Sequence, residues 1–262
     1  MDFFYLYHSV FATLMTWGLT ALGAATVFFF KKNNEKKMSF VFGFASGVMI
    51  AASFFSLLLP GIELSVALGQ NEFLPVSFGF LLGGAFILVV DLFLPKINVS
   101  NELKNESSPI NQKILLVLAI TLHNIPEGLA IGVAFGSAAL GLEEATIASA
   151  WVLALGIGLQ NFPEGMAVSM PLRNDDISTR KAFFIGQASG IVEPISAIIG
   201  VILAMNVREI LPVVLGFAAG AMIYVVVEEL IPSGKTNKEN KFATMGVIMG
   251  FIVMMILDIA LG

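Results

Sequence analysis

Long apolar runs, separated by short polar connections, follow one another along the whole chain. A membrane-spanning α-helix needs about 20 consecutive and predominantly apolar residues. Eight segments meet this requirement, at approximately 7–30, 39–59, 74–94, 113–136, 145–170, 182–204, 210–231 and 242–261. The pattern therefore predicts an all-α polytopic membrane protein with eight transmembrane helices, in which residues 1–262 form a single transmembrane domain.

The composition agrees with this prediction and limits the chemistry. Of the 262 residues, 57% are hydrophobic and only 13% are charged, whereas soluble domains are about half apolar and about a quarter charged. The lipid bilayer is thus the expected environment, and nucleic acid is not an expected partner. The chain has no cysteine, so any metal ion must be held by imidazole, carboxylate, amide, thioether or water.

The basic residues indicate the orientation in the membrane. Cytoplasmic loops of membrane proteins carry an excess of Lys and Arg. Here the first, third, fifth and seventh connections and their edges carry 13 of the 14 basic residues, and Arg208 is alone on the other side. The odd connections are therefore predicted to be cytoplasmic and both termini extracytoplasmic, in the cell (inner) membrane.

Two related polar motifs interrupt the fourth and fifth apolar segments. HNIPEG occupies residues 123–128 and QNFPEG occupies residues 160–165. Ionisable residues inside a membrane are costly and usually functional. Residues three and four apart share a helix face, so each motif presents a carboxylate beside two other polar side chains. Glu193 in the sixth segment adds a third carboxylate. The candidate ligands are His123, Asn124, Glu127, Gln160, Asn161, Glu164 and Glu193.

Because these candidates include three carboxylates and no Lys or Arg, the sequence predicts a site for one cation, or for two cations bridged by shared carboxylates. Imidazole with carboxylates suits zinc, iron, manganese or cobalt. A proline lies within or beside each ligand run: Pro126, Pro163 and Pro194. Each lacks an N–H and leaves the carbonyl four residues earlier without its helical donor. We therefore expect helix breaks at these points, of the kind at which transporters bind ions.

Other polar residues are weaker candidates for a pathway. Met49 and Ser53 can line it, and Glu228 and Glu229 can assist release at the inner end of the seventh segment. Glu63 and Asp258 are interpreted as solvated helix ends in preference to an attracting vestibule. Small residues four apart, in Gly79/Gly83 and Gly216/Gly220, predict close helix packing and no chemistry.

The two xNxPEG motifs, together with GQASGIVEP at 186–194, resemble the ZIP (Zrt/Irt-like) family of divalent-metal transporters and its GufA-type branch in particular. Residues 51–63 and 216–232 resemble that branch as well. The resemblance implies an eight-helix fold, with helices 1–3 and 6–8 as inverted repeats around helices 4 and 5. It also implies uptake of divalent metal into the cytoplasm, with zinc first and iron, manganese and cadmium as further cargo. No prosthetic group is expected, and a homodimer is compatible with this interpretation.

The family's binuclear site maps onto the same candidates. By the resemblance, His123, Glu127, Gln160 and Glu164 hold one metal ion, and Asn124, Glu127, Asn161, Glu164 and Glu193 hold the other. Many relatives have His where Gln160 stands, and some have Asp where Asn161 stands. Two other classes of function remain open from the residues alone. One is an intramembrane metal-dependent hydrolase, since a two-metal site can activate water, and the other is a proton-coupled carrier of an organic solute.

Overall fold

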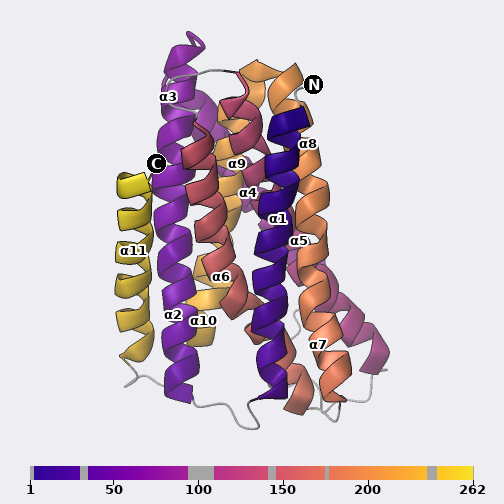
Figure 1. Cartoon of the computed structure of the whole chain (residues 1–262). Helices are drawn as coiled ribbons and strands as arrows, with labels where there is room; N and C mark the ends of the chain where they lie inside the picture. The colour runs from indigo at the N-terminus through magenta and orange to yellow at the C-terminus, as the bar shows by residue number, and fades with distance from the viewer. Residues whose placement is uncertain are drawn as a thin grey trace.

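The computed structural model describes residues 3–29, 35–93, 109–140, 146–174, 177–234 and 241–261, and the regular structure in these ranges is helical (Figure 1). Each of the eight predicted spans corresponds to a helix or to a run of joined helices. The first, third, fourth, fifth and eighth spans are single α-helices. Their bounds are α1 Phe3–Ala25, α4 Leu74–Phe93, α5 Pro109–Ala138, α6 Ile147–Asn174 and α11 Phe242–Leu261.

The second, sixth and seventh spans change helix type along their length. The second is α2 (Glu35–Ala52), a π-helical segment η2 (Ser53–Leu58) and α3 (Leu59–Ala67). The sixth is α7 (Thr179–Ala188), a 3₁₀ turn η4 (Ser189–Ile191) and α8 (Val192–Asn206). The seventh is α9 (Leu211–Val225), a second π-helical segment η6 (Val226–Leu230) and α10 (Ile231–Gly234). Short 3₁₀ turns, η1 (Thr26–Phe28) and η5 (Arg208–Ile210), follow α1 and precede α9.

The apolar character of these helices matches a bilayer. Within the described ranges, five segments are long and apolar enough to cross a membrane: Phe3–Phe28, Lys36–Ala67, Thr179–Asn206, Arg208–Leu230 and Phe242–Leu261. Leu74–Val90 of α4 is a shorter apolar helix. Large apolar side chains such as Leu81, Ile199 and Ile256 are exposed on the outer faces. Apolar surface of this extent requires lipid around it.

The expected breaks at Pro126 and Pro163 are wrong, because α5 and α6 continue as α-helix through both prolines. Local departures from α-helix occur instead in η2, η4 and η6. The 3₁₀ turn η4 lies just before Pro194, where a break was expected. Each π-helical segment ends two residues before a proline, Pro60 or Pro232. The wider turn accommodates a ring that cannot donate to the preceding carbonyls.

Glycines bring the helices into close contact in pairs. The pairs that pack most extensively are α2 with α11, α4 with α9, α5 with α8, and α1 with α6. In the α4–α9 pair, a Cβ at Gly79 or Gly83 would overlap the carbonyl oxygens of Val213 or Phe217. Gly216 and Gly220 face Val76 and Phe80 of α4 in the same way. The prediction of close packing at these four glycines is confirmed.

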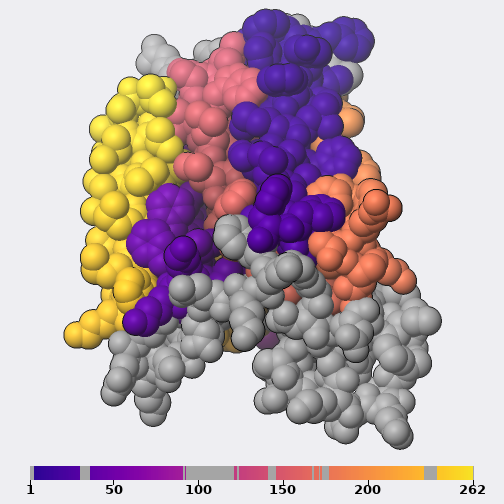
Figure 2. All heavy atoms as spheres, turned by 60° about the horizontal axis from the view of Figure 1, so that its bottom comes forward, coloured from indigo at the N-terminus to yellow at the C-terminus, as the bar shows by residue number. Residues whose placement is uncertain are grey.

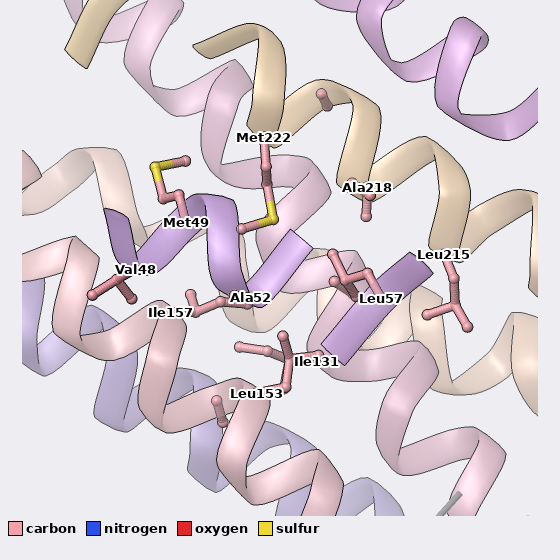
Figure 3. Close-up of a cluster of buried hydrophobic side chains, with 14 of the residues drawn as sticks. Val48, Met49, Ala52, Leu57, Ile131, Leu153, Ile157, Leu215, Ala218 and Met222 are labelled. Atoms are coloured by element: carbon pink, nitrogen blue, oxygen red, sulfur yellow. The ribbon is translucent and has the colours of Figure 1, made fainter. Parts of the chain in front are cut away.

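The helices form two groups joined by an apolar core. The first group contains α1, α5, α6, α7 and α8, and the second contains α2, α3, α4, α9, α10 and α11. Figure 2 shows α6 at the surface between α11 and α1, where the two groups adjoin. Figure 3 shows the apolar contact inside, where Ile131, Leu153 and Ile157 of the first group lie beside Met49, Ala52 and Met222 of the second.

Two adjacent glycines of α4 provide a direct test of this packing. A Cβ at Gly83 would overlap the Phe217 carbonyl, whereas a Cβ at Gly84 would have Gly220 O, 3.9 Å away, as its nearest neighbour. We expect Gly83→Ala to destabilise the protein by about 1–3 kcal/mol through overpacking. Gly84→Ala, the matched control, is expected to be neutral or stabilising by about 0.5–1 kcal/mol, because alanine favours the helix. Thermal melting of the two purified variants in detergent measures the difference, and equal melting temperatures would contradict it.

Candidate metal site

The final glycine of each PEG motif sets how closely the site-bearing helices approach. A Cβ at Gly128 of α5 would overlap the backbone carbonyl of Glu193 and the hydroxyl of Ser196 on α8. A Cβ at Gly165 of α6 would overlap the carbonyl of Thr20 on α1. In each motif the glutamate is thus followed directly by a glycine, and the absence of a side chain at that glycine lets the backbone of the neighbouring helix approach. This close approach lets side chains of α1, α5, α6 and α8 meet in one cluster.

Hydrogen bonds between helices connect the members of this cluster. Gln160 Nε2 donates to Glu127 Oε1 at 2.6 Å, which joins α6 to α5. Asn161 Nδ2 donates to Glu193 Oε1 at 2.9 Å, which joins α6 to α8. Thr16 Oγ1 of α1 donates to Glu193 Oε2. Asn124 Nδ2 donates to the carbonyl oxygen of Ser189 in η4 at 3.1 Å. The donors that contact Glu127 and Glu193 among the described residues are therefore neutral amides and a hydroxyl.

The cluster is buried, but some of its oxygen atoms have no hydrogen-bond partner among the described residues. Asn124, Glu127, Gln160, Asn161 and Glu193 are each at most 2% exposed. Within the described part of the chain, four of their oxygens have no hydrogen-bond partner: Asn124 Oδ1, Glu127 Oε2, Gln160 Oε1 and Asn161 Oδ1. A buried polar atom without a partner costs about 1–3 kcal/mol, and more when it is charged. Four such acceptors in one cluster suit a cation as ligand, because carboxylate and amide oxygens can bind metal ions.

The electrostatics of the cluster favour the same ligand. Glu127 lies close enough to Glu164 and to Glu193 for its charge to interact with the charge of each of them. Like charges that interact in a medium of low dielectric constant repel more strongly than they do in water. A divalent cation placed among them would offset the repulsion and could be bound by the acceptor oxygens that have no hydrogen-bond partner among the described residues. Neutral donors such as Gln160 and Asn161 do not supply that charge.

The predicted ligands are brought together to different extents. Asn124, Glu127, Gln160, Asn161 and Glu193 form the cluster, and Glu164 is partly buried next to it on α6. The backbone of His123 lies in α5, but its side chain is outside the described residues, so its role stays a prediction. Among the described side chains, no three His, Asp or Glu residues are placed to hold a metal ion on their own. Amide ligands are therefore part of any site built from them.

The residues predicted as weaker candidates for a transport pathway differ from one another in burial. Met49 is 1% exposed and belongs to the apolar core (Figure 3). Ser53, also 1% exposed, lies in η2, and its Oγ has no hydrogen-bond partner within the described ranges. Glu63 and Glu228 are exposed, and Glu229 is half-buried.

Asp258 forms a hydrogen bond with a residue of another span. It is half-buried on α11 and accepts a hydrogen bond of 2.7 Å from Ser56 Oγ in η2. This contact connects the π-helical segment of the second span to the eighth span. Asp258 is therefore only partly exposed, whereas Glu63 is exposed; the interpretation of both as solvated helix ends stays a prediction.

Sequence reasoning missed Thr16 and Ser189, both of which contact predicted ligands. A signal for Thr16 was present, because Ser9, Thr13, Thr16 and Thr20 recur at helical spacing in an otherwise apolar segment. All four are at most 1% exposed, on the inner face of α1. Ser189 contributes its backbone carbonyl, which a sequence motif does not reveal.

Apolar helices packed around a buried cluster of carboxyl and amide groups define an integral membrane protein with a candidate site for cations. Comparison with known proteins gives the family. The family model described as ZIP Zinc transporter matches residues 100–258. Zinc transporter ZIP11 of Xenopus tropicalis is 39% identical over 97% of this chain and 97% of its own length. Zinc transporter ZIPB of Bordetella bronchiseptica is 36% identical over 93% and 78%, respectively. Zinc transporter GufA of Myxococcus xanthus is 36% identical over 96% and 98%.

The chain belongs to the ZIP family of transporters. The resemblance seen in the two xNxPEG motifs is thereby confirmed, including the likeness to GufA. This protein is a transporter and not an enzyme, which excludes the alternative of a metal-dependent hydrolase.

Proposed function

We propose that this protein carries divalent transition-metal ions, zinc first, into the cytoplasm through the cluster on α1, α5, α6 and α8. The observation that carries the proposal is the set of four buried acceptor oxygens without hydrogen-bond partners in the described residues, one of them on Glu127, whose charge interacts with Glu164 and Glu193. The names of the relatives, all zinc transporters, support zinc as the cargo. Iron, manganese and cadmium are the further cargo we propose for the same oxygen-rich site.

The ligands have distinct roles in this proposal. Glu127 and Glu164 clamp or bridge the ions, and His123 supplies a nitrogen ligand. Gln160 completes one metal position through Oε1, while Asn124, Asn161 and Glu193 complete the second. In support, the amide groups of Gln160 and Asn161 donate to Glu127 and Glu193 with Nε2 and Nδ2. Their oxygens remain available for a cation. Amide ligands without thiolates suit a site that must release its ion.

We further propose that the first three spans and the last three spans are inverted repeats, arranged around the fourth and fifth spans, α5 and α6. In such a repeat the second span (containing α2) is equivalent to the seventh (containing α9), and the third (α4) is equivalent to the eighth (α11). The symmetry therefore relates the α2–α11 pair to the α4–α9 pair. The first span (α1) is likewise equivalent to the sixth (containing α8), and α5 to α6, so the symmetry also relates the α5–α8 pair to the α1–α6 pair. Extensive packing in all four pairs supports this symmetry, as do the π-helical segments, each two residues before a proline, in the second and seventh spans.

Movement of one helix group against the other would expose the site to each side of the membrane in turn. The closest backbone contacts at the glycines lie within the groups, in the four extensively packed pairs. The two groups meet in the core through apolar side chains such as Ile157 and Met222. Such contacts can slide without breaking hydrogen bonds. The distribution of basic residues supports an orientation with both termini extracytoplasmic, in the cell membrane, and hence inward transport.

Influx into proteoliposomes containing an internal zinc reporter tests the function. We expect wild-type protein to carry zinc inward, and Glu127→Ala combined with Glu164→Ala to reduce influx to the level of protein-free vesicles. Removing two carboxylates leaves the cation without charge compensation. Undiminished influx in the double variant would contradict the proposal. Flux of protons that depends on an organic solute and not on metal would favour the solute carrier.

A further inference from the structure

Thr16 contacts Glu193 from a helix that carries none of the predicted ligands. Its Oγ1 donates to Glu193 Oε2, across 177 residues of sequence. The other oxygen of the same carboxyl, Oε1, accepts from Asn161 Nδ2 at 2.9 Å. Thr16, Asn161 and Glu193 are all fully buried. The carboxyl of Glu193 is therefore held between α1 on one side and α6 on the other.

Thr16 donates its hydroxyl proton to another helix, whereas its neighbours on α1 do not. Thr13 Oγ1 bonds Ser9 O at 2.9 Å, and Thr20 Oγ1 bonds Thr16 O at 3.3 Å. Both are bonds within the helix, as is usual for threonine in helices. Thr16 Oγ1 also lies 3.0 Å from Thr13 O, but a hydroxyl has only one proton to donate. A carboxylate is the stronger acceptor, so the bond to Glu193 is the one we assign.

The surroundings of Gly190 restrict the Glu193 carboxyl further. A Cβ at Gly190 would lie 2.8 Å from Trp17 Cδ1, 3.1 Å from Thr20 Oγ1 and 3.2 Å from Glu193 Oε1. Gly190 of η4, which packs against Trp17 and Thr20 of α1, thus lies close to this carboxyl. Its orientation depends on the donors it retains, because Glu193 has no charged donor among the described residues.

We propose that Thr16 is a positioning residue that orients Glu193 for metal binding and so sets the affinity for the transported ion. This inference rests on the proposed function. A carboxylate can bind a metal ion through one oxygen while a hydroxyl donates to the other. Hydrogen bonds to ligating carboxylates orient them, and losing such a bond lowers metal affinity by about 10- to 100-fold.

Thr16→Val tests the proposal, because valine keeps the shape and loses the hydroxyl. Zinc influx into proteoliposomes is measured against zinc concentration and normalised to folded protein. We expect the half-saturating concentration to rise about tenfold, with the maximal rate retained. Thr16→Ser, which keeps the donor, is expected to behave as wild type. Thr13→Val is the matched control, since it removes a hydroxyl from the same buried face that bonds only within α1.

A merely structural role for Thr16 would lower the maximal rate or the yield and leave the half-saturating concentration unchanged. Half-saturation of Thr16→Val within about twofold of Thr13→Val would overturn the proposal, as would a failure of Thr16→Ser to match wild type. If Thr16→Val does not fold, Thr16→Ala compared with Thr16→Ser is judged by the same criterion. Zinc binding to the detergent-solubilised protein gives a second measure. Absence of wild-type influx would reject the proposed function, whereas the binding comparison still decides the role of Thr16.

Discussion

Glu127→Gln is expected to reduce zinc influx by at least about 100-fold while leaving the fold intact. Glutamine has almost the same shape as glutamate, and its amide oxygen can still accept the hydrogen bond that Gln160 Nε2 now gives to Glu127 Oε1. The substitution therefore removes mainly the negative charge and one ligand oxygen. Glu127 Oε2 is buried without a partner in the described residues, and the charge of Glu127 interacts with Glu164 and Glu193, so the substitution acts at the centre of the proposed site. Loss of a single supporting contact in a metal site already costs about 10- to 100-fold, and loss of a ligand should exceed this.

Zinc influx in proteoliposomes, compared at equal amounts of folded protein, measures this effect. Glu63→Gln is the matched control, because it makes the same change at an exposed glutamate of α3. A rate for Glu127→Gln within about twofold of Glu63→Gln would show that the carboxylate of Glu127 is not a ligand. The cluster would then be a structural hydrogen-bond network.

Gly128→Ala is expected to reduce influx by about tenfold or more, although glycine supplies no ligand. The added Cβ would overlap the Glu193 carbonyl and the Ser196 hydroxyl, and would lie 2.7 Å from Glu193 Cα. Since these are mostly backbone atoms, α5 and α8 must separate. Glu193 would then move away from Glu127 and from its donor Asn161. Sites that bind metal tolerate displacements of only about 0.5 Å, so the ion should bind more weakly.

The measurement is again influx against zinc concentration, with circular dichroism and size-exclusion chromatography to establish that the variant is folded. Gly18→Ala on α1 is the control, because a Cβ there would meet nothing within 4 Å. We expect Gly18→Ala to transport as wild type. A wild-type half-saturating concentration in Gly128→Ala would mean that the α5–α8 contact does not set the geometry of the site.

The properties that the sequence predicted depend on local pattern. Apolar length predicted the spans, because a bilayer requires about 20 apolar residues whatever their neighbours are. Helical spacing placed Asn124 and Glu127 on one face, and Gln160, Asn161 and Glu164 on another, because 3.6 residues per turn is a property of a single helix. Glycines four apart predicted close helix packing in the third and seventh spans, and the structure shows that these two spans pack against each other. The resemblance of the PEG motifs predicted the family, which the comparisons confirm.

The tertiary structure decided which side chains meet and where the helices depart from α geometry. Pro126 and Pro163 were expected to break α5 and α6, but both helices continue, and the π-helical segments lie before Pro60 and Pro232 instead. The spacing within one helix says nothing about which neighbour its polar face contacts. Only the folded chain places the Thr16 hydroxyl of α1 on Glu193 of α8, and Gly128 against the backbone of Glu193. The physical reason is that the sequence determines the faces of each helix separately, whereas a binding site depends on how several helices approach one another.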